Sequence, residues 1–234
     1  MRGATTAGSL RRRSIIALAF AALAAVVTAI GVALPADAAN SKVLGKPRSA
    51  PPPECPGAGC SAFVNATGFQ VEAKGKKNIF KAREDGNLVA FSIDVSKPNK
   101  DERNFFENNF GNEVRARIAV LKRLENNRFR LLRQSPKVNL NSLLGREQFF
   151  TLNQPLKIRK GNILALTAPT WLPALASDLP PNQTKWRASR RRGKCSSLGD
   201  VKDGNPQQKV GSERKYSCTY NLDRLLYWGY YVPA

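Results

Sequence analysis

The densest group of charged side chains in the chain lies between Lys185 and Lys194. Six of these ten residues are basic, and a tryptophan stands among them: Lys185, Trp186, Arg187, Arg190, Arg191, Arg192 and Lys194. Cations at this density bind phosphate, sulfate or carboxylate groups, and arginine can do so through two parallel hydrogen bonds. The segment ends at Cys195, whose oxidation would hold it in place. It is therefore a candidate polyanion-binding segment.

A second basic surface follows from a predicted hairpin over residues 114–131. Its apolar residues alternate as Val114, Ala116 and Ile118 on one strand and Phe129 and Leu131 on the next. If all five point into one core, the period of two brings four arginines together on the opposite face: Arg115, Arg117, Arg128 and Arg130. Such a face suits a polyanion. The alternative is a solvated face that confers solubility and discourages edge-to-edge pairing.

The absence of histidine from all 234 residues restricts the chemistry of the chain. It excludes Ser-His-Asp and Cys-His catalysis and histidine-ligated zinc or copper. No G-x-S-x-G elbow, P-loop or G-x-G-x-x-G accompanies the expected strands, and we predict neither a cofactor nor a metal. A hydrolase that uses two carboxylates remains open. However, Glu84, Asp85, Asp101 and Glu102 lie at expected turns, which is typical of solvated carboxylates.

Aromatic residues near the C-terminus are of types that stack on sugar rings. They are Trp171, Tyr227, Trp228, Tyr230 and Tyr231. In a strand, alternate residues point to opposite faces, so at most two or three of them can meet a ligand. Core packing is the favoured interpretation, because terminal strands of sandwiches carry large buried rings.

Four cysteines, Cys55, Cys60, Cys195 and Cys218, indicate disulfides in an oxidising compartment. Three connectivities are possible. The spacing favours a tight Cys55–Cys60 loop and a Cys195–Cys218 bridge that joins two late strands. The alternative, a four-thiolate metal site, lacks the usual pair of C-x2-C knuckles.

The first 39 residues have the organisation of a cleavable signal peptide. Arg11-Arg12-Arg13 precedes an uncharged apolar run over residues 14–34, and Ala36-Asp37-Ala38 fits a cleavage site. An uncleaved anchor and a twin-arginine export route are the alternatives. Removal of residues 1–39, which hold four Arg and one Asp, lowers the net charge from +21 to +18. The basic excess therefore belongs to the mature chain, which has no second apolar run of membrane-spanning length.

The mature part reads as a linker followed by one domain. Residues 40–54 are rich in Pro, Ser and Lys and predict an extended linker, and residues 55–234 predict a single domain. Short alternating segments and frequent turns indicate nine or ten strands, with one short helical turn over residues 102–111. Because there are no helices for crossovers, we expect an all-β, two-sheet antiparallel sandwich of jelly-roll type with two disulfides.

Three segments, at residues 85–91, 156–166 and 224–228, resemble uncharacterised secreted β-sandwich proteins of high-GC Gram-positive bacteria. The middle one, Leu156-Lys157-Ile158-Arg159-Lys160-Gly161-Asn162-Ile163-Leu164-Ala165-Leu166, is also similar to a hairpin of jelly-roll sugar-binding modules. The resemblance covers about a third of the mature chain. It implies a fold and a compartment and leaves the ligand open.

These observations predict a secreted or envelope-associated, non-catalytic binding or structural module. Its expected partner is an anionic wall polymer, such as a teichoic acid, or a glycan, held by the four arginines and the 185–194 segment. Nucleic acid is disfavoured, since only Trp186 is an aromatic placed among the cations. The alternative is an extracellular carbohydrate-active hydrolase. The sequence does not specify an oligomeric state.

Overall fold

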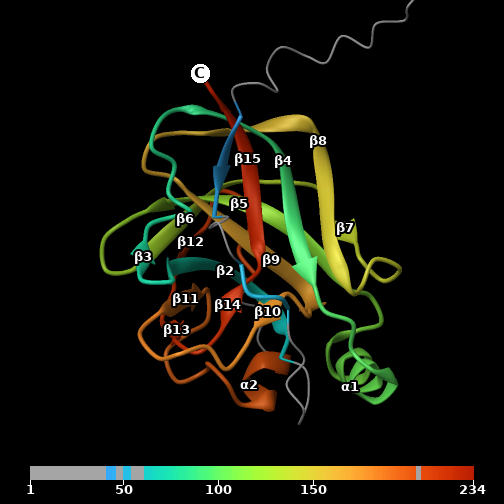
Figure 1. Ribbon diagram of the computed structural model, residues 1–234. Coiled ribbons are helices and arrows are strands. Elements are labelled where there is room, and N and C mark those ends of the chain that lie inside the picture. The colour runs from blue at the N-terminus through green and yellow to red at the C-terminus, as the bar shows by residue number, and fades with distance from the viewer. Residues whose placement is uncertain (1–40, 46–49, 54–60, 204–206) are drawn as a thin grey trace, which may run out of the picture. The chain divides into compact units, whose positions relative to one another are not determined.

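The structure, a computed structural model, describes residues 41–45, 50–53, 61–203 and 207–234. These residues form fifteen strands and two helices, and every pair of strands is antiparallel (Figure 1). The prediction of an antiparallel all-β fold is confirmed. The expected nine or ten strands are too few, because several strands are only two or three residues long and two of the long segments are interrupted.

The smaller of the two main sheets has four strands in the order β1-β15-β4-β8. Their bounds are β1 (Lys42–Leu44), β15 (Tyr227–Pro233), β4 (Gly86–Val95) and β8 (Arg146–Ile158). Strand β1 lies within the predicted linker and pairs with the C-terminal strand, so this part of residues 40–54 belongs to the folded domain. Strand β8 is the longest of these, with 13 residues.

The larger sheet follows the order β12-β6-β5-β9-β2-β11-β13, with β3 beside β2 and β7 beside β5. The bounds are β2 (Phe63–Ala73), β3 (Lys76–Lys77), β5 (Arg115–Arg123), β6 (Arg128–Gln134), β7 (Val138–Asn139), β9 (Ile163–Leu172), β11 (Thr184–Ala188), β12 (Glu213–Lys215) and β13 (Cys218–Tyr220). A separate two-stranded sheet joins β10 (Leu175–Ala176) to β14 (Arg224–Leu225).

The larger sheet must curl, because its two edge strands are neighbours in the chain. Only Tyr216 and Ser217 separate the end of β12 from the start of β13. The three chain steps from Lys215 to Cys218 span at most about 11 Å. Seven flat strands spaced about 4.8 Å apart would be roughly 29 Å wide. The sheet therefore bends until its edges approach each other.

The bend gives the larger sheet a buried interior of its own, which we call the inner core. Tyr216 is fully buried there, with its ring centroid 4.8 Å from that of Phe129 and 5.8 Å from that of Phe69. Its hydroxyl donates to Oε1 of Gln208 at 2.9 Å. The opposite face of the sheet packs against the four-stranded sheet in a larger core that contains Trp171, Tyr227 and Leu88. Trp171, Tyr227 and Trp228 are almost fully buried.

The register of the β5–β6 hairpin overturns the expectation that the alternating apolar residues of both strands point into one core. Arg123 pairs with Phe129 and Leu121 pairs with Leu131, and paired residues point to the same side of a sheet. Phe129 and Leu131 therefore face the inner core with Leu121, whereas Ile118 faces the core between the sheets. The prediction of a single core was wrong because β5 is buried on both faces, so the alternation of apolar residues along it does not distinguish a buried face from an exposed one.

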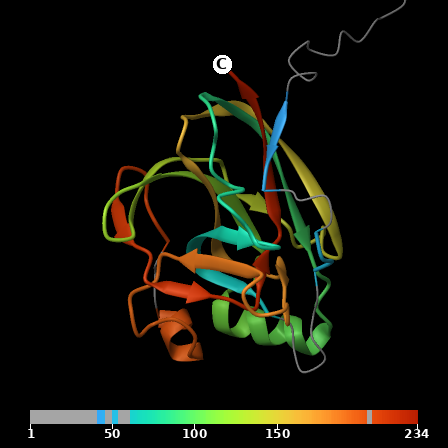
Figure 2. The same ribbon diagram turned by 60° about the vertical axis from the view of Figure 1, so that its left-hand side comes forward.

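The two helices lie at the same end of the domain in both views (Figure 1; Figure 2). Helix α1 (Lys100–Phe110) is longer than the predicted turn, and α2 (Leu198–Asp203) was not expected. Asn99 caps α1 by accepting the backbone N–H of Glu102 at 2.9 Å, and the Glu102 carboxylate accepts the N–H of Asn99 at 2.8 Å. Phe106 of α1 stacks on Trp171, with ring centroids 4.9 Å apart.

The Cys195–Cys218 disulfide is present as predicted, and it ties the loop after β11 to the start of β13. Cys55 and Cys60 lie outside the described residues, as do the predicted signal peptide and residues 46–49 of the predicted linker. The remaining prolines of the predicted linker, Pro51-Pro52-Pro53, form neither helix nor strand.

The double-sided burial of β5 gives a stability prediction. Ile118→Ala and Leu121→Ala should each lower the free energy of unfolding by about 2–5 kcal/mol, because each leaves a cavity in a different core. Lys122→Ala, at the exposed position directly after Leu121 in the strand, should change it by less than about 0.5 kcal/mol. Urea unfolding of the three variants measures this. A Leu121→Ala variant as stable as Lys122→Ala would contradict the inner core.

Candidate functional site

The four arginines of the β5–β6 hairpin do not share a face. Arg115 and Arg117 lie on the inner-core side of β5, and Arg128 and Arg130 lie on the opposite side of the sheet. The prediction of one arginine face is therefore wrong, for the reason of register given above. Three of the four also have carboxylate partners: Glu213 pairs with Arg130 and, at 3.1 Å, with Arg128, and Arg115 pairs with Glu113.

The 185–194 segment is likewise divided among different environments. Trp186 is 4% exposed and stacks on Tyr220 with ring centroids 3.9 Å apart. Arg190 is buried and donates to the carbonyl of Val64. Lys194 pairs with Asp200 at 2.8 Å. The remaining cations are half-buried or exposed: Lys185, Arg187, Arg191 and Arg192.

Cations without ion-pair partners among the described residues collect in a different place, which we call the basic groove. This groove of about 420 Å³ is lined by four cationic side chains and three neutral residues: Lys77, Lys81, Arg83, Lys160, Asn78, Ala82 and Gly161. All four cations are exposed. None of them forms an ion pair within the part of the chain that the structure describes. The groove is thus a concentrated positive site that no acidic residue lines.

Backbone hydrogen bonds hold the two sides of the groove together. The N–H of Gly161 donates to the carbonyl of Ala82 at 2.9 Å, and the N–H of Ala82 donates to the carbonyl of Asn162 at 2.9 Å. Gly161 has φ +87°, a conformation that favours glycine, so it allows the tight turn before β9. Asp85 accepts the backbone N–H of Lys160 at 2.8 Å and fixes this turn beside Arg83.

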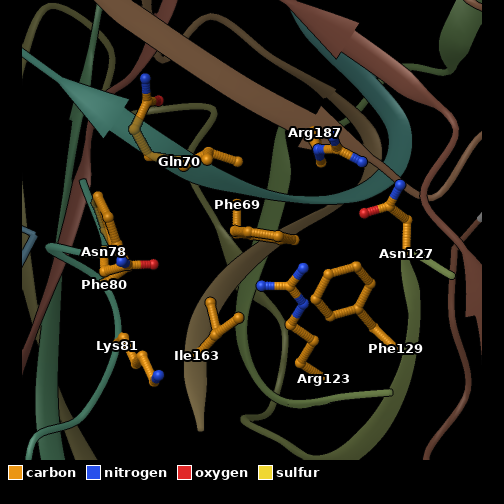
Figure 3. A pocket seen from close by; sticks show the side chains of 11 residues that line it. Phe69, Gln70, Asn78, Phe80, Lys81, Arg123, Asn127, Phe129, Ile163 and Arg187 are labelled. Carbon is orange, nitrogen blue, oxygen red and sulfur yellow. The ribbon is translucent and has the colours of Figure 1, made fainter. Parts of the chain in front are cut away.

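A smaller cavity adjoins the groove at the open end of the inner core, and we call it the mouth pocket. It has a volume of about 120 Å³ and shares Asn78 and Lys81 with the groove. Figure 3 shows Arg187 on one side of the Phe69 ring and Arg123 on the other. Burial, and then the positive charge of Arg123, lower the pKa of Arg187.

A third cavity, of about 410 Å³, lies beside the helices and is lined mostly by apolar and aromatic side chains, Phe106, Trp186 and Tyr220 among them. We call it the aromatic cavity. Its one acidic lining residue is Asp223, and no acidic residue lines the basic groove or the mouth pocket. A two-carboxylate mechanism needs an acid and a partner within one cleft. None of these three cavities supplies both.

A second cluster of basic residues in the sequence indicates the basic groove, but it is less dense than the cluster in the 185–194 segment. Residues 74–83 contain five cations in ten positions: Lys74, Lys76, Lys77, Lys81 and Arg83. Lys160 is far away in the chain and joins them only through the pairing of Lys81 with Ile163 at the start of β9. Arg123 and Arg187 converge only because the larger sheet curls.

No family model, curated protein or solved structure matches this chain. Within residues 41–45, 50–53, 61–203 and 207–234, none of the helices has the length and apolar character needed to cross a membrane. Groups of three or more acidic or cysteine side chains placed to hold a metal ion are also absent from this part of the chain.

The environment of Asp223 predicts a pH-dependent stability. Burial, with a smaller contribution from the Asp178 carboxylate, raises the pKa of Asp223. The folded state then binds this proton more tightly than the unfolded state. The ionised Asp223 carboxylate therefore lowers the free energy of unfolding. This destabilisation is absent below the unfolded pKa of about 3.9 and is fully present above the raised pKa of the folded state.

Asp223→Asn should therefore raise the free energy of unfolding at pH 7, and the gain should shrink as the pH falls to about 3. Urea unfolding at the two pH values measures the difference. Glu125→Gln, at an exposed turn, is the control and should show no such gain. A variant Asp223→Asn that is less stable than the parent at pH 7 would overturn this assignment.

Proposed function

We propose that this protein is a secreted, non-catalytic binding module of the cell envelope that holds an anionic wall polymer or glycan in the basic groove. One observation carries the proposal: Lys77, Lys81, Arg83 and Lys160 line one groove that no acidic residue lines. Exposed cations clustered in this way attract a chain of phosphate or carboxylate groups over several ångströms. The net charge of +18 that remains after removal of residues 1–39 adds a long-range attraction of the same sign.

A polymer fits the groove better than a single small ion does. Its cations come from three separate segments, the β2–β3 hairpin, residues 81–83 and the turn at Lys160, so they are spread along the groove. Three of the four are lysines, which act as flexible point charges and do not require one fixed ligand geometry. Repeating anionic units can satisfy them one after another.

The composition of the groove also distinguishes this proposal from its alternatives. No aromatic residue lines it, whereas proteins that bind single-stranded nucleic acid combine cations with stacking rings. The hydrolase alternative needs two carboxylates in one cleft, and Asp223 is the sole acidic side chain that lines any of the three cavities. Both facts favour binding without catalysis.

Two finer features of the expected module stay predictions. One is the jelly-roll connectivity of its sheets. The other is a second disulfide between Cys55 and Cys60. Peptide mapping of the unreduced protein by mass spectrometry tests the second directly: a Cys55–Cys60 crosslinked peptide is expected, and free thiols at both positions would refute it.

Cosedimentation with isolated Gram-positive cell walls across a salt titration tests the proposed function. Binding should be strong at low salt and should weaken steeply as salt screens the groove. A variant with Lys77→Ser, Arg83→Ser and Lys160→Ser should bind roughly tenfold or more weakly, since each lost surface ion contact is worth up to about 1 kcal/mol.

The matched control is the variant Arg128→Ser, Arg130→Ser and Arg133→Ser. It removes the same number of charges from another exposed region, so it should retain most of the binding. Equal losses in the two variants would mean that only the total charge matters. Absence of wall binding at low salt would reject the proposal.

A further inference from the structure

The mouth pocket combines an apolar wall with cations at its opening. Five of its lining residues are apolar: Phe69, Val71, Phe80, Phe129 and Ile163. Phe69 and Phe129 pack with ring centroids 5.0 Å apart and form part of the inner core. The cations that line it are Lys81, Arg123 and Arg187, and the other residues are Gln70, Asn78 and Asn127. The basic groove, by contrast, has no aromatic wall.

Arg123 and Arg187 line the same small pocket, and the positive charge of Arg123 acts on Arg187. Arg187 is half-buried, and its pKa is lowered first by burial and then by Arg123. Its hydrogen bond to the carbonyl of Tyr216 is long, at 3.5 Å. Neither arginine forms an ion pair with any residue that the structure describes. An anion between the two guanidinium groups would relieve this repulsion.

Both arginines are placed by the fold and not by local sequence. Arg187 pairs with Phe69 across β11 and β2, and Arg123 pairs with Phe129 at the end of the β5–β6 hairpin. In each pair the guanidinium group and the aromatic ring point to the same side of the sheet. Each cation therefore stands beside one of the two rings, and the turn residue Asn127 reaches toward the same opening (Figure 3).

We propose that the mouth pocket binds a small amphiphilic carboxylate. The apolar body would lie against Phe69, Phe129 and Ile163, and the carboxylate would accept hydrogen bonds from Arg123 and Arg187. Arginine suits this role because its planar fork matches the two oxygens of a carboxylate. The volume of about 120 Å³ limits the body to one ring or a short alkyl chain. This site adjoins the basic groove and shares Asn78 and Lys81 with it, but the two arginines and the apolar wall belong to the pocket alone, and the inference does not depend on the proposed function.

Ligand-observed ¹⁹F NMR with 4-fluorobenzoate on the purified protein tests the inference. The matched neutral probe is 4-fluorobenzyl alcohol, which has the same ring without the charge. The carboxylate should bind with a dissociation constant on the order of 1 mM, as expected for so small a ligand. The alcohol should bind at least about tenfold more weakly, since it cannot form the charge-assisted hydrogen bonds.

Arg123→Gln and Arg187→Gln should each weaken 4-fluorobenzoate binding by about tenfold. Arg123 is exposed at a strand end, so its variant should keep the parent thermal midpoint even if the half-buried Arg187 position proves sensitive. The exposed control Arg133→Gln should bind like the parent. Equal binding of both probes, undiminished binding by Arg123→Gln, or no binding of the carboxylate would each overturn the inference.

The groove variant Lys77→Ser, Arg83→Ser and Lys160→Ser separates the two sites. It should bind 4-fluorobenzoate within about twofold of the parent while losing wall binding, because none of these three residues lines the mouth pocket. A tenfold loss of the small ligand in this variant would show that the two probes report one shared site and would reject a separate pocket.

Discussion

The two-residue link between β12 and β13 is the constraint on which the rest of the structure depends. Tyr216 and Ser217 join the two edges of a seven-strand path, and a flat sheet could not satisfy so short a connection. The curl buries Tyr216 between Phe69 and Phe129 and creates the inner core. The Cys195–Cys218 disulfide ties the chain at the same edge. The short link, the buried tyrosine and the disulfide all lie next to the start of β13, at one edge of the larger sheet.

The same curl also brings together charged residues that lie on different strands of the sheet. It brings Arg123 of β5 and Arg187 of β11 to one opening, although two strands, β9 and β2, lie between β5 and β11 in the sheet. The β2–β3 hairpin reaches the turn at Lys160 for another reason: β2 pairs directly with β9, and backbone bonds between residues 80–82 and 161–164 complete the basic groove. The mouth pocket thus depends on the bend, and the basic groove depends on the pairing of neighbouring strands.

Much of the fold was predictable because alternation and turn residues mark strands locally. The predicted hairpin over residues 114–131 corresponds to β5 and β6, and the Cys195–Cys218 bridge is the pairing that the spacing favoured. The site was harder to predict. Arg115 and Arg117 lie on the same face of β5 as Leu121, which is buried in the inner core. A prediction that assumes one buried face per strand treats that face as exposed. Register, strand pairing and curl are long-range properties, and Lys160 meets Lys77 only through the pairing of residues far apart in the chain.

Hydrogen–deuterium exchange with and without a purified teichoic acid tests the central claim most directly, since it locates the bound polymer. Protection should concentrate in residues 76–83 and 159–161, the segments that line the basic groove. Protection confined to residues 128–133 or 190–194, with none at the groove, would contradict binding in the basic groove. It would instead assign polymer binding to the basic segments that the sequence predicted.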